Sequence, residues 1–156
     1  VPDEMVGLPA GFLQAGVPAV VGTLWSVADL STALLMVRFH ELRIGDGLSS
    51  ATALRRAQQW LRDLTVAEFT RYLEAHEALL DAQRREAEEA GAADAATDDA
   101  EGEPEERISQ ELLTKGKRYI RKTRRREGLA DDHRPFADPY YWAGFAYYGL
   151  IGKEDV

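Results

Sequence analysis

The sequence predicts an α/β protein, and three observations lead to that class. A short apolar, β-branched run at 17–24 directly follows a helix-like segment. A second β-prone run, rich in aromatic residues, lies at 138–152. Apolar residues between the two runs recur at helical spacing. Strands that are apolar on both alternating faces are typical of sheets covered by helices, so we expect a few buried strands flanked by helices.

The composition excludes several kinds of protein. The 156 residues correspond to about one domain and include no cysteine, so this chain has no disulfide framework, thiolate metal site or cysteine nucleophile of its own. The formal charge of −8 disfavours nucleic acid as a partner of the whole chain. No apolar run reaches the ~20 residues that span a bilayer, and no signal-peptide pattern is present, so we expect a cytoplasmic protein without a membrane partner. The first residue, Val1, is consistent with a fragment or an unusual start codon.

The first two elements expected are a helix over 8–16 and a strand over 17–24. Pro9 suits the first helical turn, because the N–H that it lacks would have no partner there. Gly16 suits the position just after the helix end. The strand follows the helix without a linker, and this succession of a helix and a buried strand is typical of α/β proteins.

Two further helices are expected after the strand. Asp29 or Ser31 can cap the first of them, which we expect to run to about Arg43. Ser49 or Ser50 opens the second. The first helix has a wide apolar face, as expected for a helix that packs on a sheet, and the second runs through Leu54, Ala57 and Leu61.

The middle of the chain changes character. Residues 65–68 read Thr-Val-Ala-Glu, a capping box that opens another helix. Residues 86–106 contain ten acidic residues and no basic one, and we expect this stretch to be disordered because it cannot bury apolar surface. Residues 115–126 contain eight basic residues and no acid, and they predict a marginal, solvated helix with a thin apolar stripe.

The closing run at 138–152 predicts an interior strand. Its aromatic and aliphatic residues fall on both alternating faces, which favours burial on both sides. Gly144 and Gly149 allow a close approach of a neighbour or a bulge. We expect Trp25 and this closing segment to lie side by side in one central layer.

Four segments resemble a single family, and their order and spacing strengthen the match. They occupy 7–16, 24–29, 53–58 and 138–145. Leu-Trp-x-Val-x-Asp in the second segment and Pro-Tyr-Tyr-Trp-Ala-x-Phe in the fourth are the most specific pieces. Together the segments resemble the C-terminal half of CHAT domains, which are related to caspases and separases.

The resemblance implies a partial caspase-like α/β/α sandwich. Residues 1–152 would form the C-terminal portion of one CHAT domain, interrupted by an insertion at about 65–134 that the family does not explain. The family hydrolyses peptide bonds with a cysteine nucleophile and a histidine base, both of which lie upstream of the helix that begins this chain. His40, His76 and His133 do not match that histidine. We therefore expect the substrate-pocket half of a cysteine peptidase, inactive on its own.

The resemblance also suggests where a substrate would bind. Asp29 follows the strand at the position where related peptidases place a pocket acid, which could pair with a basic P1 side chain. A helix N-cap is the alternative role for Asp29. Trp25 would wall this pocket or serve as a core aromatic residue, and Ser26 is a candidate for a pocket backbone position. The expected partners are a protein or peptide substrate and an activating protein.

Other readings of the chain stay open. The insertion is a self-compensating solvated element, a protein-docking element or, less favoured, a nucleic-acid contact. The three adjacent residues Asp131, Asp132 and His133 rarely converge on one ion, so we expect neither a metal nor a cofactor. The alternative function is a non-catalytic interaction or scaffold module derived from a CHAT domain, which would self-associate through an exposed sheet edge.

Overall fold

The structure, a computed structural model, describes residues 7–89, 104–127 and 130–149, and the chain divides into two compact units. Unit 1 comprises Val1–Asp63 and Phe136–Val156, and unit 2 comprises Leu64–Pro135. Each unit therefore has its own set of packed elements, and we describe them in turn.

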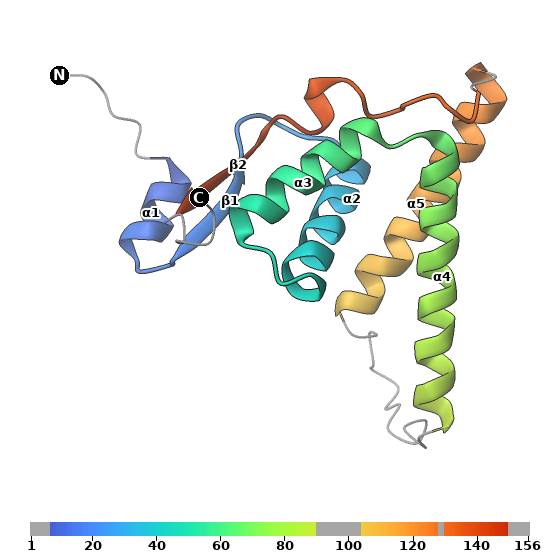
Figure 1. The fold of residues 1–156 in the computed structure, drawn as a ribbon, viewed down its shortest axis with the longest axis horizontal. Helices are drawn as coiled ribbons and strands as arrows, with labels where there is room; N and C mark the ends of the chain where they lie inside the picture. Colours follow the sequence, from blue (N-terminus) through green and yellow to red (C-terminus); the bar gives the residue numbers. More distant parts are fainter. Residues whose placement is uncertain (1–6, 90–103, 128–129, 150–156) are drawn as a thin grey trace. The chain divides into compact units, whose positions relative to one another are not determined.

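A two-stranded antiparallel sheet joins the two ends of unit 1. β1 (Ala19–Thr23) pairs with β2 (Phe145–Gly149) in a register that sets Ala19 opposite Gly149 and Thr23 opposite Phe145 (Figure 1). The described residues are mostly helical with this one small sheet, so the predicted partial α/β class is confirmed. Most strand positions are half-buried, because each strand pairs with a single neighbour within the described residues.

Helix α1 (Leu8–Gln14) precedes β1 as predicted. Pro9 lies in its first turn. Gly16 follows the helix end with a φ of 89°, a left-handed conformation that favours glycine over residues with a Cβ. No residue of α1 is fully buried, so this helix leaves apolar surface in contact with solvent.

Two helices supply the core of unit 1. α2 (Asp29–His40) continues into a π-helical turn, η1 (Glu41–Gly45), and packs against α3 (Ser50–Asp63). The hydroxyl of Ser49 accepts a hydrogen bond from the Thr52 N–H at 3.4 Å, so Ser49 caps α3, as one of the two predicted candidates. The buried apolar side chains of this packing are Leu34, Leu35, Phe39, Leu42, Ala53, Leu54, Ala57 and Leu61.

The predicted N-cap of α2 is wrong. Ala28 occupies the cap position with an extended backbone, and it makes no side-chain cap hydrogen bond. Ser31 and Thr32 instead donate their hydroxyls to the Ala28 carbonyl oxygen, each at 2.9 Å. Asp29 is the first helical residue, where its carboxylate is favoured by the partial positive charge of the helix N-terminus.

Unit 2 is a pair of long helices, α4 (Val66–Glu89) and α5 (Pro104–Glu127). The predicted capping box opens α4: the Thr65 N–H donates to the Glu68 carboxylate at 2.9 Å, and the Glu68 N–H donates to the Thr65 hydroxyl at 3.2 Å. The predicted basic helix is part of α5, and its apolar stripe packs on α4. The buried apolar side chains in these helices are Val66, Phe69, Leu73, Leu112, Leu113 and Ile120.

The acidic stretch predicted at 86–106 lies mostly outside the described residues. The structure describes helix up to Glu89 and again from Pro104, and residues 90–103 are not described. None of the described helices is both long and apolar enough to cross a membrane.

The closing segment contains a shorter strand than predicted. Its first part is a 3₁₀ turn, η3 (Pro139–Tyr141), because Asp138 caps it by accepting the Tyr140 N–H at 2.8 Å. Proline at the first helical position favours the same conformation. The strand therefore starts only at Phe145, and residues 150–152 lie outside the described range.

Candidate functional site

Two of the predicted site residues, Trp25 and Ser26, lie on the connection from β1 to α2, and the third, Asp29, is the first residue of α2. Trp25 is anchored to the closing segment. The Leu24 N–H donates to the Gly144 carbonyl oxygen at 2.8 Å, which extends the pairing of the two strands by one step. The Trp25 indole N–H then donates to the Tyr140 carbonyl oxygen at 3.1 Å. The expectation that Trp25 and the closing segment lie side by side is therefore confirmed.

Gly144 provides the surface on which the indole lies. A Cβ added at Gly144 would be 2.7 Å from Cε2 of Trp25, closer than real Cβ atoms approach. Gly144 is buried, whereas 39% of Trp25 is exposed. The indole thus has one part packed against backbone and another part open to solvent.

Ser26 follows Trp25 on the connection, and Asp29 lies three residues further on. Both side chains are exposed, and Asp29 begins α2. The backbone contacts of Leu24 and the indole contact of Trp25 fix the start of this connection, and the first turn of α2 fixes its end. A carboxylate at a fixed, exposed position can pair with a cationic ligand group.

Gln58 is a positioning residue that the sequence reasoning missed. From α3, its side-chain amide donates to the carbonyl oxygens of Trp142 and Phe145, each at 2.9 Å. These two bonds hold the turn between η3 and β2 against the helix. A signal existed in the sequence, because Gln58 lies four residues after Leu54 and three before Leu61, on the apolar side of α3.

Two further contacts hold Trp142 in the closing segment. Its indole N–H donates to the Ala137 carbonyl oxygen at 3.3 Å, and the Arg62 guanidinium lies 5.9 Å from its ring centroid. Phe136 and Tyr141 also meet edge to face, with ring centroids 5.6 Å apart. The segment that contacts the Trp25 indole is therefore held by contacts within itself and with Arg62 of α3.

The three histidines lie in unrelated surroundings. His40 contacts the Phe39 ring with centroids 5.1 Å apart, and His76 contacts Tyr72 with centroids 5.6 Å apart. His133 accepts the Val66 N–H at 2.9 Å through its backbone oxygen. Within the part of the chain that the structure describes, no group of three or more His, Cys, Asp or Glu residues is arranged to hold a metal ion.

Comparison with known proteins gives one match. The family model described as CHAT domain matches residues 1–150. This range includes β1, the connection with Trp25 and Asp29, and β2. Neither the curated proteins nor the solved structures contain a significant match to the chain.

Proposed function

Because the chain belongs to the CHAT domain family, a family of caspase-like peptidases, we propose that it forms the substrate-recognition part of such a peptidase. The 156 residues contain no cysteine, so the thiolate that attacks the scissile carbonyl is not among them. This chain then contributes binding and not bond cleavage. Its substrate would be a peptide or a protein segment.

The anchored Trp25 is the observation that supports this role most strongly. Its hydrogen bond to the Tyr140 carbonyl and its contact with Gly144 hold the start of the β1–α2 connection in one position. A binding residue that follows such an anchor loses little conformational freedom when a ligand binds. Asp29 follows it at the start of α2, with an exposed carboxylate.

We assign the three residues complementary roles. The Asp29 carboxylate accepts hydrogen bonds from the cationic P1 side chain of the substrate. The Trp25 ring supplies a wall for the aliphatic part of that side chain, and an aromatic face also attracts a cation. Ser26 contributes its backbone groups to the bound peptide. Because a guanidinium binds a carboxylate with two parallel hydrogen bonds, arginine is expected to bind more tightly than lysine.

Peptide binding by the 156-residue chain tests the assignment. Fluorescent peptides that differ only in arginine, lysine or uncharged citrulline at one position are titrated with the wild type, Asp29→Asn and Asp46→Asn. Asp46 is an exposed carboxylate elsewhere in unit 1, at the end of η1, so its variant controls for the loss of one negative charge. We expect Asp29→Asn to lose about tenfold in affinity for the arginine peptide and to lose most of its preference for that peptide over citrulline, with the remainder due to the Trp25 ring.

Two results would contradict the proposal. Equal arginine preference in the wild type and Asp29→Asn would remove Asp29 from substrate recognition. Hydrolysis of any of these peptides by the purified chain would show that it cleaves without a cysteine, contrary to the proposed division of roles.

A second candidate function is a non-catalytic interaction module, and exposed apolar surface in unit 1 favours it. Leu8 is 76% exposed and Leu24 is 62% exposed, and Phe12 and Leu13 on α1 also contact solvent. Each strand of the sheet has one paired edge and one unpaired edge within the described residues. Such surfaces are typical of protein–protein contacts. Analytical ultracentrifugation of wild type and Phe12→Ser tests this function: concentration-dependent association that the variant weakens supports it, and a monomer at every concentration contradicts it.

A further inference from the structure

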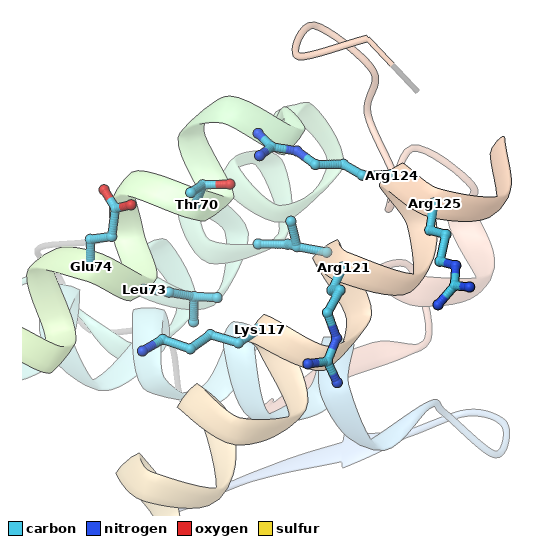
Figure 2. A pocket seen from close by; sticks show the side chains of 8 residues that line it. Thr70, Leu73, Glu74, Lys117, Arg121, Arg124 and Arg125 are labelled. Atoms are coloured by element: carbon cyan, nitrogen blue, oxygen red, sulfur yellow. The ribbon is translucent and has the colours of Figure 1, made fainter. Parts of the chain in front are cut away.

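A groove between α4 and α5 in unit 2 gathers cationic side chains around an apolar floor. It has a volume of about 540 Å³, within the range of small-ligand and peptide side-chain sites. Figure 2 shows α4 and α5 contributing opposite walls. The lining residues are Thr70, Leu73, Glu74, Lys117, Ile120, Arg121, Arg124 and Arg125.

Two of the four cations in the groove have partners within unit 2. Lys117 forms an ion pair with Glu77, and Arg124 forms one with Asp131 at 2.9 Å. Such internal pairing neutralises part of the field and holds these side chains in place. These two residues are therefore weaker candidates for binding an added anion.

Arg121 and Arg125 differ from the other two cations. Among the described residues, neither takes part in a hydrogen bond or an ion pair, and both are exposed. They are four residues apart on α5, and Figure 2 shows both extending on the same side of that helix. Like charges at this spacing destabilise a helix, so an anion that binds both guanidinium groups relieves their repulsion.

The rest of the lining favours a peptide over nucleic acid. Leu73 and Ile120 form an aliphatic floor, and none of the described residues that line the groove is an aromatic one that could stack on a base. The net charge of −8 opposes a long polyanion. A short acidic peptide is affected mainly by the local field, because charges beyond a Debye length of about 8 Å are screened at physiological salt.

We propose that this groove binds a short acidic segment of a partner protein. Carboxylates two residues apart in an extended segment are separated by about 6.6 Å, close to the 5–6 Å between side chains one helical turn apart. One carboxylate binds Arg121 and the other binds Arg125, and each forms a bidentate ion pair with its guanidinium group. An aliphatic side chain beside them lies against Ile120. This site is independent of the peptidase role proposed for unit 1.

The test titrates a fluorescein-labelled peptide containing Leu-Glu-Ser-Glu-Leu with the whole 156-residue chain. The double variant Arg121→Gln, Arg125→Gln is compared with Arg55→Gln, Arg56→Gln, which removes the same charge from an exposed part of α3. We expect the groove variant to lose at least about tenfold in affinity and the α3 variant to change less than about twofold. Circular dichroism checks folding, and the single variant Arg121→Gln, with a smaller expected loss, replaces the double variant if that does not fold.

Three outcomes would overturn the proposal. Equal losses in the groove and α3 variants would mean that net charge alone attracts the peptide. Tighter, arginine-dependent binding of a single-stranded oligonucleotide would identify a nucleic-acid site instead. If replacing the ten acidic residues of 86–106 by glutamine or asparagine tightens peptide binding more than about tenfold, the chain's own carboxylates are the occupant.

Discussion

The Trp25 indole N–H donates to the carbonyl oxygen of Tyr140, a residue 115 positions later in the chain. This hydrogen bond joins the end of β1 to the turn that leads into β2. The bond places an exposed aromatic side chain at the start of the connection that also carries Asp29. The geometry of the candidate site therefore depends on residues at both ends of the sequence.

The close contact between Gly144 and Trp25 gives the first prediction. In Gly144→Ala the new Cβ would lie 2.7 Å from the indole, so Trp25 must move outward and lose its bond to Tyr140. We expect a destabilisation of about 1–3 kcal/mol and a red shift of tryptophan emission. Urea unfolding followed by tryptophan fluorescence reports on unit 1, which contains all three tryptophans. Gly45→Ala is the control, because no atom of the part of the chain that the structure describes lies within 4 Å of a Cβ there.

The paired hydrogen bonds of Gln58 give the second prediction. Gln58→Ala leaves the carbonyl oxygens of Trp142 and Phe145 without this donor in a half-buried position. We expect a loss of about 1–3 kcal/mol in the free energy of unfolding. The neighbouring Gln59 is exposed, and Gln59→Ala should change the free energy by less than about 0.5 kcal/mol. Equal effects of the two substitutions would contradict the positioning role of Gln58.

Local signals predicted several elements because the residues that determine them are neighbours in sequence. The capping box at Thr65 and Glu68 and the left-handed Gly16 each follow from side-chain or backbone chemistry within one turn. The prediction for the cap of α2 is wrong, because side-chain chemistry alone does not fix where the helix begins. Asp29 and Ser31 have the right chemistry for a cap, but Ala28 occupies the position at which the backbone changes from extended to helical.

Features that depend on distant residues were not predictable in the same way. The role of Gln58 needs the turn at Trp142–Phe145 to lie against α3, which no local pattern specifies. Taken from the sequence alone, the basic residues of α5 are distributed around the whole helix. Only the packing of α4 against α5 determines which of them line the groove. The antiparallel register of β1 and β2 likewise joins segments separated by more than a hundred residues.

The capping box of α4 gives the third prediction, a dependence of stability on acid. The backbone N–H and the hydroxyl of Thr65 both donate to the Glu68 carboxylate, and these hydrogen bonds hold the pKa of Glu68 below its ordinary value of about 4.5. A carboxylate with a lowered pKa in the folded state stabilises that state above the ordinary pKa. Its contribution is lost as the pH falls through the lowered pKa, when the folded chain also takes up the proton.

Thermal unfolding at a series of pH values tests this dependence. At pH 7 we expect Glu68→Gln to unfold at a lower temperature than the wild type, and the difference should shrink once the pH falls below about 4.5. Glu74→Gln, which removes an exposed carboxylate further along α4, controls for net charge. A wild-type advantage over Glu68→Gln that persists unchanged at pH 3 would contradict the assigned role of the carboxylate.

Close packing of α5 on α4 at Gly116 gives the fourth prediction. A Cβ at this position would lie 2.8 Å from Cδ1 of Leu73 and 3.2 Å from Cζ of Phe69. Both neighbours are almost fully buried, so neither can move into solvent to make room. Alanine favours a helix by about 1 kcal/mol over glycine, but overpacking costs about 1–3 kcal/mol, so we expect Gly116→Ala to be destabilising overall.

Amide hydrogen exchange measured on peptides from α4 and α5 locates this effect. We expect faster exchange in both helices of Gly116→Ala, because separating them exposes backbone that the wild type protects. Gly11→Ala places the same methyl group in α1, where none of the described residues lies within 4 Å, and should stabilise its helix by about 0.5–1 kcal/mol. Slower exchange in α4 and α5 of Gly116→Ala would mean that helix propensity outweighs overpacking there, and that the two helices accommodate the added methyl group without separating.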